Sequence, residues 1–420
     1  MNQINASIIT IGDELLIGQT IDTNSAFIAQ ELNKIGVWVM RRVAVADSHE
    51  AILNTLSDEA KQADIIIITG GLGPTADDIT KPALCDYFNT ELREDEAATE
   101  NVKTIFQKSG RPLTERNLSQ GLVPANCIVL PNARGTAPGM YFQNDGVSYF
   151  SLPGVPHEMR GLMHSGVVPK IKETFQLPAV VHRTLLTAGI GESFLADRIQ
   201  DFENALPGPI KLAYLPAYGM VRLRLTGRSE NKEAIEQEVA KNFEELKSLV
   251  NEWLVADEDI SIQEAVVKLL KERKQTVATA ESCTGGAIAQ LITSIAGASA
   301  VYNGTVVSYS NEVKENILGV GKETLQQYGA VSEQTVTEMA GSVCRLMKTD
   351  YALATSGIMG PDGGSEEKPV GTVWIAVAHK NGKVKAQKMA FRFDRFRNIE
   401  LTTHTAFNML RRFIMEEEVN

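Results

Sequence analysis

Four consecutive isoleucines, Ile65 to Ile68, constrain the fold more than any other stretch of this chain. A strand without a polar face belongs inside a parallel sheet whose two faces are both covered by helices. Residues 6–12 and 37–46 predict two more strands, and residues 23–36 and 49–63 predict helices that alternate with them. Strands that alternate with helices predict an α/β fold with right-handed crossovers.

The chain has 420 residues, which is too long for one ordinary core and predicts several domains. We place an α/β domain at residues 1–170 and a small α+β domain at residues 171–255. An acidic linker follows at residues 256–264, where Ser261 is predicted to cap the next helix. A second α/β domain is predicted at residues 261–420.

The charge and composition exclude some classes of function. A formal net charge of -11 argues against a general nucleic-acid binder, which usually carries a basic face. The chain contains no run of about 18 apolar residues, so we expect no membrane span. The four cysteines are scattered without a CxxC spacing, as in proteins of the reducing cytosol. We therefore expect a cytoplasmic protein that contacts neither membrane nor nucleic acid.

The middle domain supports the same expectation. Val221, Leu223 and Leu225 alternate with Arg222 and Arg224, so one face of this predicted strand is in water. The domain lacks a GxxG loop flanked by basic residues, and we assign it no nucleic-acid role.

The predicted strand at residues 276–280 stops at the sequence ESCTGG, residues 281–286, and a helical pattern begins. In one interpretation, Ser282 or Thr284 caps that helix. In the other, Ser282 is a nucleophile on a tight strand-to-helix turn, where two glycines let a substrate approach the backbone. Cys283 is the rival nucleophile.

A serine nucleophile normally needs a base. None of the six histidines falls in the neighbouring loops, so the base must be Tyr309 or Lys314, in an arrangement that resembles Ser–Lys hydrolases. A lysine serves as a base only where burial or neighbours lower its pKa. Residues 355–374 are dense in glycine and proline, which fits either a ligand-cradling loop or a long flexible hairpin. Residues 391–400 add three arginines.

Two segments of the first domain place acidic and glycine residues at strand ends, namely residues 10–25 and 65–80. Ligands of open α/β sheets bind beyond the carboxyl ends of the strands. Glycine backbone N–H groups there can bind phosphate, and carboxylates can hold a divalent ion. In the alternative interpretation, Asp77 and Asp78 are first-turn acids that the helix dipole favours.

The motifs of the third domain together resemble the nicotinamide-nucleotide amidase domain of the bacterial competence/damage-inducible (CinA) family. The resemblance implies hydrolysis of the carboxamide of nicotinamide mononucleotide (NMN) to nicotinate mononucleotide and ammonia, without a cofactor. It implies Ser282 as nucleophile, Tyr309 and Lys314 as the groups that activate it or protonate ammonia, and Thr355 as a fourth catalytic residue. The substrate-binding residues that it implies are Thr284, Gly285, Gly286, Gly357, Gly360, Gly363, Gly364, Arg395 and Arg397.

The motifs of the first domain resemble the molybdopterin-binding fold, and in this order, fused to the third domain, they resemble the CinA family over its whole length. The resemblance implies that the domain hydrolyses ADP-ribose to AMP and ribose 5-phosphate with a divalent ion, which is Co, Mg or Mn. The implied phosphate-binding residues are Gly70, Gly71, Gly73, Thr75, Gly135 and Thr136, and the implied metal ligands are Asp13, Asp77 and Asp78.

Both proposed substrates are breakdown products of NAD, which gives the fusion a rationale. We expect these small nucleotides as ligands and a homodimer as the assembly. Two rival interpretations remain, a molybdopterin-binding protein and a DNA-uptake or recombination accessory.

Overall fold

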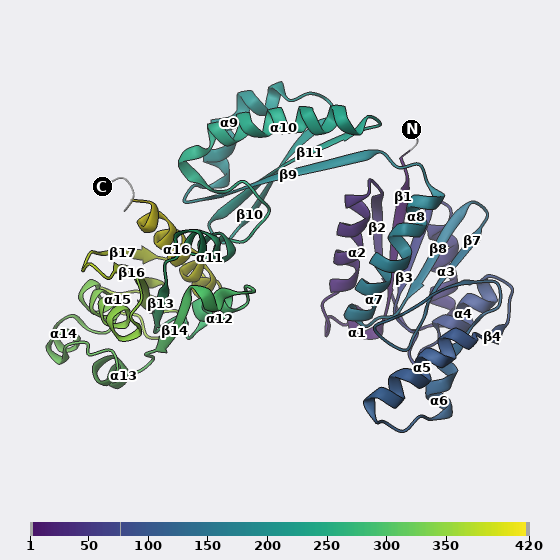
Figure 1. Ribbon diagram of the computed structural model, residues 1–420, viewed down its shortest axis with the longest axis horizontal. Coiled ribbons are helices and arrows are strands. Elements are labelled where there is room, and N and C mark those ends of the chain that lie inside the picture. The colour runs from purple at the N-terminus through teal and green to yellow at the C-terminus, as the bar shows by residue number, and fades with distance from the viewer. Residues whose placement is uncertain (1–2, 76, 417–420) are drawn as a thin grey trace. The chain divides into compact units, whose positions relative to one another are not determined.

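The computed structural model describes residues 3–75 and 77–416. The chain divides into two compact units (Figure 1). One unit contains residues up to 181 together with 227–237, and the other contains 182–226 together with the chain from 238 onward. Among the residues described, no helix is long and apolar enough to cross a membrane.

A six-stranded sheet organises the N-terminal domain, in the order β2-β1-β3-β8-β7-β6. The strands β2, β1, β3 and β8 are parallel, whereas β7 and β6 run antiparallel to their neighbours. The sheet strands are β1 (Asn5–Ile11), β2 (Trp38–Val45), β3 (Ile65–Thr69), β6 (Ile128–Leu130), β7 (Gly139–Asn144) and β8 (Val147–Leu152). A separate ribbon pairs β4 (Leu92–Glu94) with β5 (Leu122–Pro124).

Helices cover both faces of this sheet, as the isoleucine run predicts. Ile65 and Ile67 pack in one core cluster with residues of α2 and α7, and Ile66 and Ile68 pack in the opposite cluster with residues of α3 and α4 (Figure 1). The predicted buried strand is therefore confirmed. The helices are α1 (Asp13–Leu16), α2 (Thr23–Lys34), α3 (His49–Glu59), α4 (Thr80–Tyr87), α5 (Glu96–Ser109), α6 (Glu115–Leu118), α7 (Pro156–Leu162) and α8 (Val168–Thr174).

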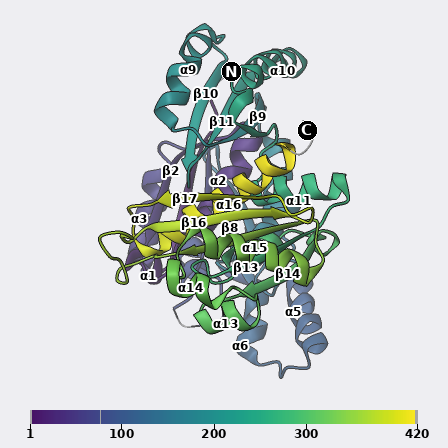
Figure 2. The ribbon, with the colours of Figure 1, turned by 90° about the vertical axis from the view of Figure 1, so that its left-hand side faces the viewer.

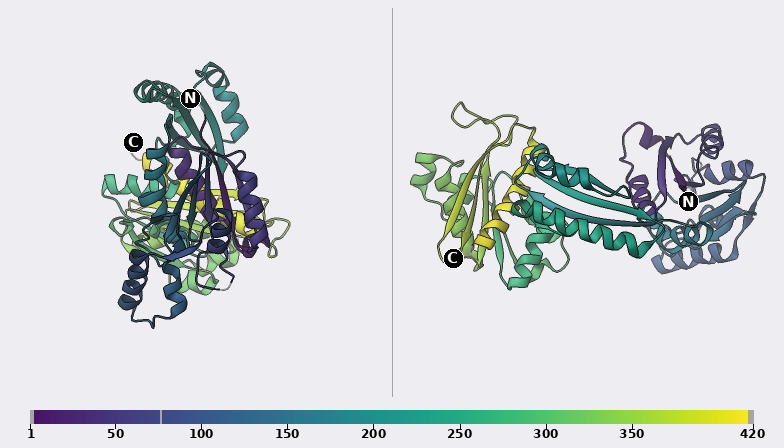
Figure 3. Two further views of the ribbon diagram at one scale, coloured as in Figure 1. Left: turned by 90° about the vertical axis from the view of Figure 1, so that its right-hand side faces the viewer. Right: turned by 90° about the horizontal axis from the view of Figure 1, so that it is seen from above.

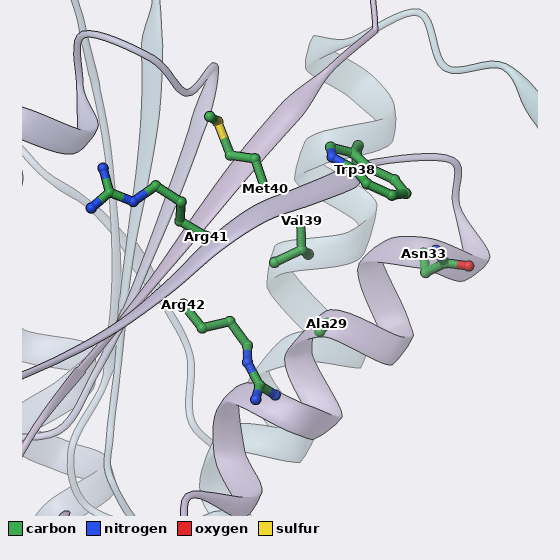
Figure 4. A pocket seen from close by; sticks show the side chains of 7 residues that line it. All are labelled: Ala29, Asn33, Trp38, Val39, Met40, Arg41 and Arg42. Carbon is green, nitrogen blue, oxygen red and sulfur yellow. The ribbon is translucent and has the colours of Figure 1, made fainter. Parts of the chain in front are cut away.

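The edge strand β2 is irregular. Its pairing with β1 shifts between Ala6 and Ser7, so that Met40 has no partner in the register. Figure 4 shows the side chains along this edge, beside a shallow hollow of about 480 Å³ between β2 and α2. A bulge together with the exposed Arg41 and Arg42 hinders pairing with another strand.

The middle domain is a four-stranded sheet in the order β10-β11-β9-β12, with two helices on the same side of it (Figure 1). Val221, Leu223 and Leu225 are buried, whereas Arg222 and Arg224 are only partly buried, which confirms the predicted alternation. The elements are β9 (Ala179–Ala188), α9 (Glu192–Ala205), β10 (Ile210–Ala217), β11 (Met220–Ser229), α10 (Lys232–Leu249) and β12 (Leu254–Ala256).

The C-terminal domain has a mixed sheet in the order β14-β13-β15-β16-β17, and its long strands β16 and β17 face the viewer in Figure 2. The strands are β13 (Val277–Glu281), β14 (Tyr302–Val307), β15 (Tyr351–Gly357), β16 (Thr372–His379) and β17 (Val384–Ala390). The first three in spatial order are parallel, and the last two are antiparallel to their neighbours.

Six α-helices complete this domain as far as residue 416, where its described part ends. Residues of α15 belong to one core cluster, and residues of α11 and α16 belong to the other. Figure 3 (right) shows α16, in yellow, beside the sheet of this domain. The helices are α11 (Ile262–Arg273), α12 (Ala287–Thr293), α13 (Asn311–Asn316), α14 (Lys322–Tyr328), α15 (Glu333–Met347) and α16 (Arg395–Glu416). Ser261 caps α11 as predicted, because its hydroxyl accepts a hydrogen bond from the Glu264 backbone N–H.

The apolar pattern predicts a helix over residues 287–297, whereas α12 ends at Thr293. The hydroxyls of Thr293 and Ser294 donate to carbonyl oxygens of the preceding turn. Gly297 then adopts a positive φ of 73°, which a right-handed helix does not contain.

Candidate active site

The sequence ESCTGG forms the turn that joins β13 to α12. The Ser282 backbone N–H donates to the Thr355 carbonyl on β15, at 3.0 Å, and the Ser282 carbonyl accepts from the Gly285 N–H at 3.2 Å. Gly285 and Gly286 have φ values of 61° and 102°, in the region that favours glycine. The turn therefore holds Ser282 at the carboxyl end of a central parallel strand, where α/β sheets bind ligands.

Ser282 lies beside a buried lysine. The Lys314 Nζ atom is 3.0 Å from Ser282 Oγ and 2.7 Å from the Ser308 carbonyl oxygen. Lys314 belongs to α13 and is only 1% exposed. Because both neighbouring groups are uncharged and water is excluded, burial lowers the pKa of Lys314. This pair has the geometry and the environment of a serine nucleophile with a lysine base.

The pair opens into a pocket of about 180 Å³. Tyr309 is 65% exposed, and its hydroxyl accepts a hydrogen bond from Arg395 Nη2 at 3.0 Å. Arg395 Nη1 also donates to the Gly360 carbonyl, at 2.9 Å, so this arginine ties the loop after β15 to the rim. The residues around the pocket are Ser282, Cys283, Tyr309, Asn311, Lys314, Ala330, Val331, Ser356, Gly357, Met359 and Arg395.

Some predicted residues lie elsewhere. Thr284 and Thr355 are buried behind the turn, with their hydroxyl oxygens 2.8 Å apart, and they do not line the pocket. Arg397 lies over the Phe393 ring, 4.1 Å from its centroid, instead of facing the pocket.

Of the loop glycines, Gly357 lines the pocket and Gly360 supplies its carbonyl to Arg395, whereas Gly363 and Gly364 do not line it. A Cβ atom at Gly364 would lie 2.8 Å from the Val370 backbone nitrogen. The need for glycine at that position comes from close backbone packing.

The structure argues against the interpretation of this turn as a helix cap made by Ser282 or Thr284. The N-cap of α12 is Gly286, without a side-chain cap bond, so neither Ser282 nor Thr284 caps the helix. The carboxylate of Glu281 does this instead, by accepting the backbone N–H bonds of Gly286, Ile288 and Ala289. We did not single out Glu281 from the sequence; the signal was a charged residue that ends an apolar strand.

Cys283 is a poor rival as the nucleophile. Burial raises the pKa of its thiol to about 12, whereas the thiolate is the reactive form of a cysteine. At neutral pH the side chain therefore behaves as a small apolar group.

The N-terminal domain has its own hollow, of about 600 Å³, beyond the carboxyl ends of its strands. Of the residues predicted to bind phosphate, Gly71, Gly73, Gly135 and Thr136 line this hollow, whereas Gly70 and Thr75 do not. A Cβ atom at Gly70 would lie 2.3 Å from the Ile11 carbonyl oxygen, so this glycine is needed for close strand packing.

Glu158 also lines that hollow, and we did not predict it. Its carboxylate accepts a hydrogen bond from Asn132 Nδ2 at 2.7 Å, and burial raises its pKa. The sequence signal was its place in the proline- and glycine-rich stretch at residues 151–159.

The structure does not assemble the predicted metal ligands. Asp78 accepts hydrogen bonds from the Gly73 and Thr75 backbone N–H groups, at 2.7 and 2.9 Å, and from the Thr75 hydroxyl. These hydrogen bonds to the Asp78 carboxylate hold the glycine-rich loop in its conformation. The Asp13 carboxylate accepts a hydrogen bond from the Asp47 backbone N–H, and the Asp47 carboxylate accepts one from the Asp13 backbone N–H. Among residues 3–75 and 77–416, no three His, Cys, Asp or Glu side chains form a group that could hold a metal ion.

Burial raises the pKa of Asp47, and the charges of Asp13, Glu14 and Asp77 raise it further. The predicted ligands Asp13, Asp77 and Asp78 therefore do not form a preformed metal site.

Comparison with known proteins identifies the family. A CinA-like protein from Cytophaga hutchinsonii is 46% identical over 413 residues, which cover 98% of this chain and 99% of that protein. The chain belongs to the CinA family. A second CinA-like protein, from Flavobacterium psychrophilum, is 43% identical over 415 residues, which cover 98% of this chain and 99% of the relative.

Three family models match successive parts of this CinA-family chain. They are "Probable molybdopterin binding domain" at residues 7–173, "Damage-inducible protein CinA KH domain" at 182–256 and "CinA C-terminal domain" at 259–414. Among solved structures, the competence/damage inducible protein CihA from Agrobacterium tumefaciens matches at 42% identity and a TM-score of 0.35. That match covers 36% of this chain and 91% of the other.

The middle segment of this CinA protein is thus a KH-like domain. Directly after β9 the chain contains Gly189-Ile190-Gly191-Glu192, in which Glu192 begins α9 and stands at the fourth position of GxxG, where that motif has glycine. The absence of a nucleic-acid role stays a prediction.

Proposed function

We propose that the C-terminal domain is a serine amidohydrolase that converts NMN to nicotinate mononucleotide and ammonia. The observation that carries this proposal is the 3.0 Å approach of Lys314 Nζ to Ser282 Oγ in a buried, uncharged surrounding. A neutral lysine at that distance can accept the serine proton.

The reaction then follows from the atoms present. Lys314 takes the proton from Ser282 Oγ as this oxygen bonds to the carboxamide carbon. The carbon–nitrogen bond breaks, and the leaving nitrogen takes the proton from Lys314 and departs as ammonia. Neutral Lys314 then takes a proton from the water that attacks the acyl-serine, and it passes this proton to Ser282 Oγ as the bond between the carbon and this oxygen breaks. The carboxylic acid leaves and loses its proton to the solvent. Arg395 lies at the rim, where its cationic guanidinium favours the phosphate of the nucleotide.

We further propose that the N-terminal domain hydrolyses ADP-ribose with the help of a divalent ion, Co, Mg or Mn. The hollow lined by glycine backbone and Thr136 supports a phosphate-bearing ligand. The ion would supply charge neutralisation at the pyrophosphate. Asp78 does not fit as its ligand, because its oxygens already hold the loop. Binding of molybdopterin without cleavage of ADP-ribose would favour the rival function.

Chelation should separate the two activities. Serine, lysine and backbone donors supply what acyl transfer needs, so excess EDTA should leave ammonia release from NMN within about twofold of its initial rate. The same treatment should abolish the formation of AMP from ADP-ribose, and adding back each of the three ions in turn should restore it. Ammonia is measured by a coupled assay and AMP by chromatography. Loss of both activities on chelation would contradict this division of labour.

A further inference from the structure

The carboxylate of Glu281 is enclosed by the turn that carries Ser282. It is 0% exposed, although it ends a strand directly beside a pocket. Its oxygen Oε2 accepts hydrogen bonds from the Thr284 hydroxyl at 2.7 Å, from the Gly286 N–H at 3.0 Å and from the Ile288 N–H at 3.1 Å. Its oxygen Oε1 accepts from the Ala289 N–H at 2.9 Å. A buried carboxylate is costly unless such donors replace its water.

The position of this carboxylate in the chain is unusual for a helix cap. A capping side chain normally comes from the residue directly before the helix, which here is Gly286. Glu281 instead reaches across the turn from the end of β13 to the first turn of α12. It therefore bridges the turn of residues 282–286, whose first residue is Ser282.

A second link fixes the turn from the other side. Thr284 donates its single hydroxyl proton to Glu281, so the neighbouring Thr355 hydroxyl must donate to Thr284. The Thr355 carbonyl oxygen also accepts a hydrogen bond from the Ser282 backbone N–H. A connected chain of hydrogen bonds thus runs from β15 through Thr284 to Glu281. Such networks stay rigid only when every member is satisfied.

We infer that Glu281 is a positioning residue, which holds the Ser282 hydroxyl at its distance from Lys314 without touching the substrate. The inference rests on the proposed role of Ser282 as nucleophile, but not on the identity of the substrate. It also explains why Thr284 and Thr355 lie behind the pocket: both belong to the support of the turn.

The test compares Glu281→Gln with the wild-type protein. The amide places N–H donors against backbone N–H groups, so the turn loses acceptors while the side-chain shape is kept. We expect kcat for ammonia release from NMN to fall about 10- to 100-fold, because small misplacements of reacting groups have effects of that size. We expect KM to change by less than about twofold, and the pH midpoint of kcat to stay where it is.

A substrate-independent readout accompanies the kinetics. A fluorophosphonate forms a P–O bond to an activated serine and expels fluoride, and the intact mass reports the labelling rate. Glu281→Gln should label Ser282 more slowly, by the same factor as kcat falls. The matched control is Glu323→Gln, which removes an exposed carboxylate from the first turn of α14 and should behave as wild type.

Each outcome decides something. Labelling and kcat of Glu281→Gln within about twofold of wild type would overturn the inference. If the wild-type protein is labelled at Ser282 but releases no ammonia from NMN, the proposed substrate fails, and the labelling rates still test Glu281. An unlabelled and inactive wild-type protein would overturn both. If Glu281→Gln does not fold, Thr284→Val removes one donor to the same carboxylate; an unchanged labelling rate would then sink the inference.

Discussion

Replacing Ser282 with alanine should cut the turnover of NMN by about 10³-fold or more and leave the fold intact. The hydroxyl is the group that bonds to the carboxamide carbon, and no other group at 3.0 Å from Lys314 Nζ can take its place. Because Ser282 does not cap α12, the stability cost of about 1 kcal/mol that a lost cap brings should be absent. Ammonia release and the melting temperature measure the two effects.

Cys283→Ala is the matched control for this variant. The thiol is buried and its pKa is raised to about 12, so we expect turnover close to wild type with a modest loss of stability. An active Ser282→Ala protein together with an inactive Cys283→Ala protein would mean that the turn is a cysteine site.

Replacing Lys314 with methionine should lower turnover by about as much as Ser282→Ala does, since members of a catalytic unit give similar losses when removed alone. Methionine keeps the length of the side chain but removes the amine that accepts the serine proton. The fold should be retained or stabilised, because the variant no longer buries an ionisable amine beside uncharged groups. The exposed Lys322, changed to methionine in the same way, is the control. Substantial turnover by Lys314→Met would show that another group is the base.

The lowered pKa of Lys314 also predicts the pH profile. The neutral amine is the base, so kcat should rise as pH rises through that lowered pKa and then level off. In the unfolded chain the lysine keeps its ordinary, higher pKa and binds the proton more tightly. The wild-type protein should therefore gain stability relative to Lys314→Met as pH rises toward about 10.4, the ordinary value of a lysine. A kcat that stays flat from about pH 5 to about pH 10 would contradict the assignment.

The sequence predicts what depends on local pattern. Ile65 to Ile68 predict a doubly covered strand because burial on both faces removes every polar position. Lys314 could be named as a candidate base for Ser282 because a serine nucleophile needs a base and no histidine falls in the neighbouring loops.

The sequence does not predict where a side chain finds its hydrogen-bond partners. Asp78 was assigned to a metal, but its oxygens bind backbone N–H groups within the same loop. The resemblance implies a catalytic role for Thr355, and the structure shows its hydroxyl bonded to that of Thr284, which lies 71 positions away in the chain. The role of Glu281 depends likewise on the exact geometry of one turn, which residue type and spacing leave open.

The segments that the family models recognise are not the segments that fold together. One compact unit holds both the region from 259 onward and most of the KH-like region. Leu186 and Met220 of the KH-like region share a core cluster with Phe407 on α16, and Arg411 Nη1 donates to the Leu254 carbonyl at 2.9 Å. The C-terminal region can therefore become a separate protein only if the residues that contact the KH-like region also change. A free-standing version must acquire polar residues where the KH-like strands now exclude water.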